Sequence, residues 1–248
     1  MTGVEDEALL DEPTRRDRAV DSRARCGRTY MDLPSARLQI EVFSDVVCPW
    51  CWLGKRRLER AREQLDFADK IEVHWRAFQL DPGASVEPRP YADVLARKYG
   101  PDAVPRITNR LGQLGRQEGL DYRWDRVQRV NSFDAHRLLA WAATHGTDAQ
   151  NALAERLFRA YFTEGANVAD RATLASLAGE AGLDVDDAAA VLEAGAFADA
   201  VRDDLEEAVE NDVLGVPAFL LAPGFAIPGA QEVETFKMML TRVHDRRS

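Results

Sequence analysis

Apolar and polar side chains begin to alternate at residue 38, where the chain first shows the pattern of a folded protein. Apolar side chains at Leu38, Ile40 and Val42 occupy every second position, which is typical of a strand with one buried face. Residues 71–77 repeat this alternation more clearly. Between the two strands, apolar residues at helical spacing predict a helix that fades near Asp66, so this stretch is expected to form a β-α-β unit.

From residue 81 to residue 214 the pattern becomes helical, after a loop that is rich in proline. No period repeats along it, and the stretch is long enough to form a helical domain inserted into an α/β domain. Asp170, Asp184 and Asp186 are expected to cap helices. The predicted helices span residues 91–98, 104–118, 133–144, 148–163, 171–181, 187–192 and 197–210.

Strand character returns at residues 218–222 and 225–227, which flank Pro223-Gly224 and predict a β-hairpin. Apolar residues at a 3, 4, 3 spacing then predict a last helix that lays one face on the sheet. These residues are Val233, Phe236, Leu240 and Val243. The expected fold class is therefore α/β, with β-α-β and β-β-α units on either side of a large all-helical insertion.

Residues 1–36 lack any such pattern and are predicted to be a disordered extension, because they carry many charges and no sustained apolar period. If translation starts at Met31 instead, Cys26 is absent from the natural protein. The predicted α/β domain is discontinuous and combines residues 37–80 with residues 215–248. Residues 81–214 form the predicted insertion domain.

Composition and charge exclude several classes of function. With 46% hydrophobic and 30% charged residues, the chain has the composition of an ordinary globular protein. The net charge of -10 gives no general attraction to nucleic acids or to anionic membranes. No apolar run approaches the ~20 residues that cross a bilayer, and the N-terminal residues lack the apolar core of a secretory signal. A cytoplasmic protein without nucleic-acid or membrane partners is expected.

The main chemical signal is Cys48-Pro49-Trp50-Cys51, at the predicted start of the first helix. At this spacing two cysteines can reach the Cα separation of ~5.5–6 Å that a disulfide prefers. Cys48 faces the unpaired amides and the positive end of the helix, which lower a thiol pKa from about 8.5, so it is the expected nucleophile. Cys51 lies about one turn inside the helix and is the expected resolving thiol.

The two residues between the cysteines are candidate substrate-binding residues. Pro49 suits the first helical turn, because its missing amide hydrogen would have no helical acceptor there. Trp50 could cover the disulfide or offer an apolar platform to a substrate.

Two other interpretations of the cysteines are open. A zinc site would need two further ligands, but Cys26 lies in the predicted extension and the four histidines show no paired spacing. We therefore expect no metal and no cofactor other than the redox-active cysteine pair itself. Alternatively, both cysteines could be buried and inert.

Five segments together resemble the DsbA-like thioredoxin family, and in particular its FrnE-like branch, over roughly residues 38–245. Their order and spacing are more specific than a single Cys-x-x-Cys. The resemblance implies a thioredoxin-like fold with a helical insertion, which agrees with the predicted order of elements. The segments are residues 43–55 (FSDVVCPWCWLGK), 131–138 (NSFDAHRL), 161–165 (YFTEG), 215–219 (GVPAF) and 229–231 (GAQ).

The resemblance also implies roles for residues far from the cysteines. The family's proline that corresponds to Pro217 faces the dithiol through a cis peptide bond, and the backbone before it, at Val216, is free to pair with a substrate strand. Asn131 and His136 match a segment at the start of an inserted helix that borders the active site, which implies substrate binding. His136 could equally be a packing residue, and Asp45 could be a helix cap or a proton acceptor for Cys51.

These observations predict a protein disulfide oxidoreductase or isomerase that acts on protein or small-molecule thiols and disulfides, with glutathione a candidate co-substrate. One alternative is a glutathione-dependent isomerase of the 2-hydroxychromene-2-carboxylate type, with a role in natural-product biosynthesis. Those enzymes resemble the chain in their insertion, but they have a serine in place of Cys48 and lack the second cysteine. Another alternative is a non-catalytic module that binds a peptide beside Pro217. The sequence gives no indication of the oligomeric state.

Overall fold

The computed structural model describes residues 37–222 and 225–247, which belong to one compact unit of the chain. The predicted disordered extension, with Cys26 and Met31, and the Pro223-Gly224 turn lie outside the described residues.

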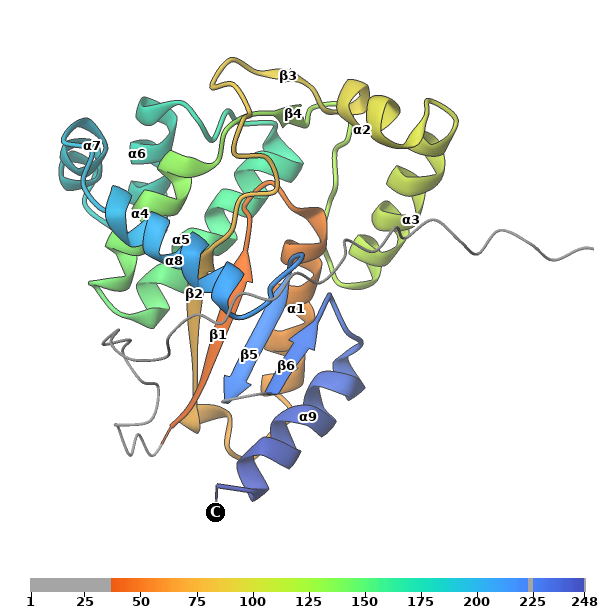
Figure 1. The fold of residues 1–248 in the computed structure, drawn as a ribbon, viewed down its shortest axis with the longest axis vertical. Helices are drawn as coiled ribbons and strands as arrows, with labels where there is room; N and C mark the ends of the chain where they lie inside the picture. The colour runs from red at the N-terminus through yellow and green to blue at the C-terminus, as the bar shows by residue number, and fades with distance from the viewer. Residues whose placement is uncertain (1–36, 223–224, 248) are drawn as a thin grey trace, which may run out of the picture. The chain divides into compact units, whose positions relative to one another are not determined.

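A four-stranded mixed sheet forms the centre of the fold, in the order β2-β1-β5-β6 (Figure 1). Strand β1 (Leu38–Ser44) pairs in parallel with β2 (Ile71–Ala77), and α1 (Pro49–Arg62) connects them. Strand β5 (Ala218–Ala222) is antiparallel to β1 and forms a hairpin with β6 (Phe225–Pro228). The predicted β-α-β unit and hairpin are confirmed.

The burial of β1 follows the alternation of its sequence up to the end that leads to the cysteines. Ile40 and Val42 are fully buried in the main core, whereas Glu41 between them is partly exposed. Phe43 breaks the alternation, because it is also fully buried, in a second cluster with Ala208 of the insertion. Both faces of β1 are therefore covered where the strand ends.

Helices α1 and α9 (Val233–Asp245) pack side by side against the sheet (Figure 1). Phe236 of α9 meets Phe219 of β5 edge to face, with ring centroids 4.8 Å apart. The apolar face that the 3, 4, 3 spacing predicts is confirmed. Helix α1 ends at Arg62, earlier than expected, because the chain then turns into a short 3-10 helix, η1 (Ala68–Lys70), before β2.

The helices between β2 and β5 agree closely with the predicted ones. They are α2 (Tyr91–Tyr99), α3 (Ala103–Gln117), α4 (Phe133–Ala143), α5 (Thr147–Arg159), α6 (Arg171–Glu180), α7 (Val185–Glu193) and α8 (Ala198–Glu210). A π-helix, η2 (Ala160–Glu164), replaces the expected end of α5, and the two-residue strands β3 (Arg89–Pro90) and β4 (Gln128–Arg129) pair with each other. Within the described ranges, no helix is long and apolar enough to cross a membrane.

Two of the three predicted aspartate caps are confirmed. Asp170 accepts a hydrogen bond from the Thr173 amide at the start of α6, and Asp184 accepts one from the Asp187 amide at the start of α7. Asp186 lies inside the first turn of α7 and does not cap it, because Asp184 already holds that position.

Strand β2 is joined to the insertion by hydrogen bonds as well as by packing. Buried Gln150 of α5 accepts a hydrogen bond from the Trp75 amide (3.0 Å) and donates one to the Trp75 carbonyl (2.9 Å). Asp204 of α8 accepts a hydrogen bond from the Ala77 amide (2.8 Å). The division into an α/β domain and a separately folding insertion stays a prediction.

Candidate active site at the start of helix α1

Cys48 is the N-cap residue of α1, directly after the turn that follows β1. The Cys48 amide donates a hydrogen bond to the Asp45 carbonyl (2.9 Å), and the Cys48 carbonyl accepts one from the Cys51 amide (3.0 Å). Pro49 occupies the first turn of the helix, as predicted, and Trp50 is half-buried against the core. This local backbone places both cysteines, which are free thiols, on one helical turn.

Cys51 is fully buried beside Cys48. Burial raises the pKa of the Cys51 thiol well above its ordinary value, and a hydrogen bond with Cys48 and the negative charge of a Cys48 thiolate raise this pKa further. Hydrogen bonds from the Ser44 hydroxyl and the Asp45 backbone offset only part of this effect. Cys51 is therefore a protonated thiol at neutral pH.

The loop before β5 faces Cys48 from a segment 168 residues away. The Cys48 thiol donates a hydrogen bond to the Val216 carbonyl, with an Sγ to O distance of 3.7 Å. The Val216-Pro217 peptide bond is cis, as the family resemblance implies. The Pro217 carbonyl accepts a hydrogen bond from the Gly229 amide (2.8 Å), which ties this loop to the end of the hairpin.

Gly54 of α1 lies directly against the same loop. A Cβ atom at this position would lie 3.1 Å from Cγ of Pro217 and 3.1 Å from Cζ of Phe219. Carbon atoms in protein interiors pack at about 3.5–4.0 Å. Helix α1 and the loop can therefore approach this closely because residue 54 has no side chain.

Asp45 is fully buried and holds three segments together. Its carboxylate accepts hydrogen bonds from the Val47 amide (3.3 Å) and from the Leu80 amide (2.7 Å), and it pairs with Nε2 of His136 at 3.3 Å. Of the roles that the sequence leaves open for Asp45, the helix cap is excluded, because Cys48 occupies the N-cap position and the Asp45 carboxylate closes the turn before it. The Asp45 backbone, rather than its carboxylate, hydrogen-bonds the sulfur of Cys51.

Asn131 and His136 have structural partners of their own. The Asn131 amide donates hydrogen bonds to the carbonyls of Pro82 (3.2 Å) and Ala84 (3.0 Å), which joins the start of α4 to the loop after β2. His136 is 3% exposed and is held by Asp45. The contact of these two residues with substrate stays a prediction.

Sequence reasoning missed Tyr122, which follows α3. Its hydroxyl donates a hydrogen bond to the Pro49 carbonyl (2.7 Å). No motif marks this residue. Gly115 makes room for its ring, because a Cβ atom there would lie 2.4 Å from it.

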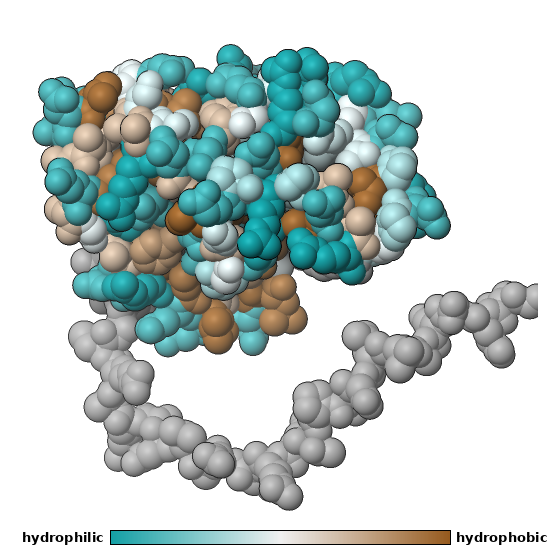
Figure 2. All heavy atoms as spheres, turned by 90° about the horizontal axis from the view of Figure 1, so that it is seen from above, coloured by the Kyte–Doolittle hydropathy of each residue, from teal (hydrophilic) through white to brown (hydrophobic). Residues whose placement is uncertain are grey.

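Apolar side chains are exposed on both segments that flank Cys48. Leu80, whose amide binds Asp45, is 50% exposed, and Leu214, two residues before Val216, is 96% exposed. Figure 2 views the molecule from the top of Figure 1, where β3, β4 and helices of the insertion lie, and it shows a largely polar face with apolar residues gathered at one edge.

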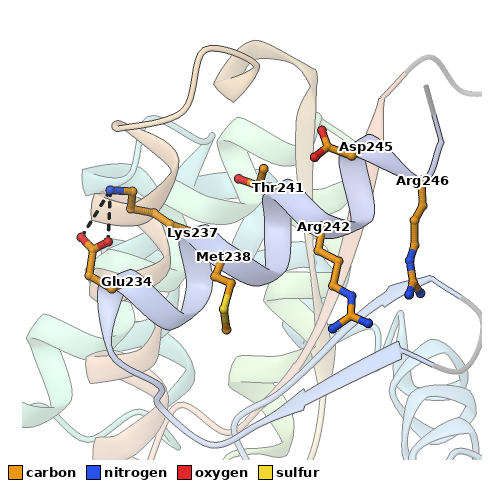
Figure 3. Close-up of a pocket in the computed structure, with 7 residues that line it drawn as sticks. All are labelled: Glu234, Lys237, Met238, Thr241, Arg242, Asp245 and Arg246. Atoms are coloured by element: carbon orange, nitrogen blue, oxygen red, sulfur yellow. Dashed lines mark hydrogen bonds and ion pairs between the residues drawn. The ribbon is translucent and has the colours of Figure 1, made fainter.

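A hollow lies on the outer face of α9 (Figure 3). Helix α9 lies toward the end of the sheet opposite to the start of α1 (Figure 1), so the hollow is not part of the cysteine site. Its polar lining includes an ion pair between Lys237 and Glu234 at 3.3 Å. The lining residues are Glu234, Lys237, Met238, Thr241, Arg242, Asp245 and Arg246.

Metal binding finds no support in the part of the chain that the structure describes. His, Cys, Asp and Glu side chains there form no group of three or more that could hold a metal ion. The expected absence of a metal and of a bound cofactor stays a prediction.

The fold and the site together define a class of protein. A β-α-β unit and a β-β-α unit share one sheet, a cysteine pair begins the first helix, and a cis-proline precedes the next sheet strand. This is the arrangement of a thioredoxin-like protein. More specifically, the chain belongs to the family of the DSBA-like thioredoxin domain, whose model matches residues 39–241.

Two proteins are similar to this chain over most of their length. The crystal structure of a probable DsbA oxidoreductase from Streptomyces coelicolor is 36% identical, covers 86% of this chain and 92% of its own, and has a TM-score of 0.80. An uncharacterized protein of Bacillus subtilis is 29% identical over 208 residues, which are 82% of this chain and 96% of that protein.

Two further solved structures share the fold at lower identity. A cytosolic disulfide reductase, DsbM, from Pseudomonas aeruginosa is 18% identical with a TM-score of 0.59, over 84% of this chain and 100% of that one, and it was also solved with GSH. A 2-hydroxychromene-2-carboxylate isomerase is 15% identical with a TM-score of 0.63, over 84% of this chain and 97% of that one.

Proposed function

We propose that this chain is a thiol-disulfide oxidoreductase that works through Cys48 and Cys51. One arrangement carries the proposal: Cys48 begins α1, the Cys51 thiol lies against it, and the Val216 carbonyl faces the Cys48 sulfur at 3.7 Å. Membership of the DsbA-like family supports disulfide chemistry of this kind.

In the reducing direction, the Cys48 thiolate attacks one sulfur of a substrate disulfide. A bond forms between Cys48 and that sulfur, the substrate disulfide breaks, and the leaving thiolate takes a proton. Cys51 then loses its proton and attacks the Cys48 sulfur, which releases the second substrate thiol. Two electrons and two protons pass to the substrate, and the Cys48-Cys51 disulfide remains. In the oxidising direction the same steps run in reverse.

The surroundings of the two thiols support these separate roles. Cys48 lies at the N-terminus of α1, where unpaired amides and the helix dipole favour a thiolate. Cys51 is fully buried with a raised pKa, so it holds its proton until the mixed disulfide has formed. The assignment of Cys48 as nucleophile and Cys51 as resolving thiol follows from this difference.

The substrate segment would lie along the loop that contains Val216 and Pro217. When Cys48 enters a mixed disulfide, it loses the hydrogen that it donates to the Val216 carbonyl. That carbonyl can then accept a hydrogen bond from a substrate amide, as in strand addition. Trp50, Leu80 and Leu214 offer apolar surface for the side chains that flank a substrate cysteine. This combination suits extended protein segments of varied sequence.

We further propose a cytoplasmic protein of the FrnE-like branch that needs no bound cofactor and can use glutathione as a co-substrate. The likeness to a cytosolic disulfide reductase that was solved with GSH supports both the location and the co-substrate. In a compartment that keeps thiols reduced, Cys48 and Cys51 would rest as a dithiol.

The first test compares the wild-type chain with Cys48→Ser and Cys51→Ala in insulin reduction and in oxidative refolding of a reduced model protein. We expect Cys48→Ser to abolish both activities and Cys51→Ala to accumulate mixed disulfides through Cys48. Undiminished activity in Cys48→Ser would refute the proposal. The reduction potential of the Cys48-Cys51 pair then indicates the direction of disulfide exchange. A value of about -270 mV indicates a reductase, and a value of about -120 mV indicates an oxidant.

A glutathione-dependent isomerase is the second candidate, because a 2-hydroxychromene-2-carboxylate isomerase shares the fold. The intact cysteine pair favours redox chemistry instead. An isomerisation that saturates with glutathione and survives Cys51→Ala would favour the isomerase. A non-catalytic peptide-binding module would show a Cys48 that is alkylated no faster than free cysteine near neutral pH.

A further inference from the structure

The hydroxyl of Tyr122 lies at the helical turn that carries both cysteines. It donates a hydrogen bond to the Pro49 carbonyl at 2.7 Å. Pro49 is the first residue of α1, and its carbonyl belongs to the peptide group that joins it to Trp50, between the two cysteines. A side chain from the insertion is therefore hydrogen-bonded to the backbone between Cys48 and Cys51.

The Tyr122 ring is fixed on all sides, so its hydroxyl cannot leave this position without repacking. It meets Trp52 edge to face with ring centroids 5.3 Å apart, stacks on Trp124 at 5.2 Å and meets Phe162 at 5.3 Å. Its remaining side lies against Gly115, where a Cβ atom would lie 2.4 Å from the ring. Tyr122 is 7% exposed, so its hydroxyl depends on α1 for hydrogen bonds.

A hydrogen bond to the Pro49 carbonyl also acts on the other end of the same peptide group. The Trp50 amide belongs to that group, and it is one of the first amides of α1, which have no helical acceptor. The hydrogen bond from Tyr122 to the Pro49 carbonyl polarises this peptide group, and the Trp50 amide becomes a stronger hydrogen-bond donor as a result. The amides at this helix start are the groups that favour a thiolate on Cys48.

Tyr122 keeps its proton over the working range of the protein. Burial raises the pKa of the Tyr122 hydroxyl far above its ordinary value, and the charge of a Cys48 thiolate raises it further. The hydroxyl is therefore a permanent donor to the Pro49 carbonyl.

We propose that Tyr122 is a positioning residue for the dithiol, whose hydroxyl holds the first turn of α1 and strengthens the stabilisation of the Cys48 thiolate. This inference rests on the proposed function, since it assigns a second residue to the same site. It also gives α3 and the loop after it a role in the chemistry, because they carry Gly115 and Tyr122.

The test is Tyr122→Phe, which removes the hydroxyl and leaves the ring. Tyr161→Phe is the matched control, because the Tyr161 hydroxyl is equally buried and donates to the Gln128 carbonyl at the same 2.7 Å, away from α1. Both are made in a Cys26→Ser/Cys51→Ala background, in which Cys48 is the one remaining cysteine. The rate of alkylation by iodoacetamide is measured from pH 4 to pH 10.

We expect Tyr122→Phe to move the midpoint of the pH profile upward and to slow alkylation below that midpoint about two- to tenfold, the effect of one hydrogen bond. The plateau at high pH should be unchanged, and Tyr161→Phe should follow the background protein. In chains with both cysteines, the equilibrium with glutathione should shift toward the disulfide by a similar factor in Tyr122→Phe, because its thiolate is less stable.

Thermal unfolding separates these effects from general damage. Both variants leave a backbone carbonyl without its buried donor and should lose similar stability, so a change in Cys48 that is confined to Tyr122→Phe supports the inference. Coincident pH profiles and glutathione equilibria for Tyr122→Phe, Tyr161→Phe and the background overturn it while leaving the redox function intact. A background protein whose Cys48 reacts no faster than free cysteine contradicts the proposed function itself.

Discussion

At the scale of single residues, the two cysteines share one helical turn but differ in their surroundings. Both are buried, but Cys48, 3% exposed, occupies the N-cap position and faces the Val216 carbonyl, whereas Cys51 lies inside the helix among Ser44, the Asp45 backbone and Cys48. The local sequence predicts this division of roles, because the positions follow from a helix start at Pro49. The contacts of Tyr122 could not be predicted, since they join segments 73 residues apart through packing that no periodicity records.

The raised pKa of Cys51 predicts how stability depends on pH in the reduced protein. A thiol whose pKa is higher in the folded than in the unfolded state stabilises the fold below its unfolded pKa, and this contribution is lost as pH rises through the folded pKa. The ordinary value here is 9.0. We therefore expect the reduced wild-type chain to lose more stability between pH 8 and pH 11 than Cys51→Ala does.

The measurement is the thermal midpoint of both proteins over this range, in the presence of a phosphine reductant. Tyrosines and lysines titrate in both proteins, so their contribution cancels in the comparison. If the thermal midpoints of the two proteins fall in parallel with pH, the pKa of Cys51 is the same in the folded and unfolded chains and the prediction is wrong.

At the scale of elements, α1 depends on a close approach to the loop before β5. Gly54→Ala should lower the free energy of unfolding by about 1–3 kcal/mol, the usual cost of overpacking, although alanine is the better helix former by about 1 kcal/mol. The contacts that resist the new methyl group are Pro217 and Phe219. Because Pro217 lies beside Cys48, disulfide exchange should slow as well.

Gly112→Ala in α3 is the matched control for this prediction. A Cβ atom there would meet the mobile end of Arg116 at 3.4 Å and nothing closer, so the helix preference of alanine should prevail and stability should rise. Denaturant unfolding of the two variants measures the difference. If Gly54→Ala and Gly112→Ala raise the free energy of unfolding equally, the loop at Pro217 can move aside for the new methyl group and the prediction is wrong.

The strands and most helices were predictable because each buries one face. Apolar residues therefore recur every two residues in a strand and about every 3.6 residues in a helix. The π-helix at Ala160–Glu164 was not predictable, since its apolar residues continue the pattern of α5. The partners of the Asp45 carboxylate were not predictable either. An aspartate shortly before a helix fits a cap, and its real partners, Leu80 and His136, come from other parts of the chain.

At the scale of the whole molecule, a buried ion pair joins the cysteine helix to the insertion. Lys55 of α1 is 2% exposed, and its ammonium contacts Glu59 at 2.5 Å and Glu155 of α5 at 3.0 Å. Glu155 also accepts a hydrogen bond from the Trp52 indole. The element that carries the chemistry is therefore fixed to the insertion directly, in addition to its contacts with the sheet.

Glu155→Leu should lower the free energy of unfolding by about 1.5–3 kcal/mol, the usual contribution of a hydrogen bond to a charged group, because buried Lys55 keeps Glu59 but loses Glu155, as does Arg56. Lys55→Met/Glu155→Leu should recover a large part of this loss, since the pair is then replaced by apolar side chains of similar size. Denaturant unfolding of the single and double variants checks this prediction. A double variant less stable than Glu155→Leu would show that the pair is worth more than its burial costs.

The side chains of Gln150 and Asp204 occupy backbone groups at the outer edge of β2. Strand β2 is the outermost strand on its side of the sheet, and outermost strands attract other strands into aggregates. The Trp75 and Ala77 groups that would recruit such a strand are already taken by side chains of the insertion. If the chain acts as proposed, an extended substrate held at Val216 would meet a β2 edge whose Trp75 and Ala77 groups are already paired, which disfavours extension of the sheet at these positions.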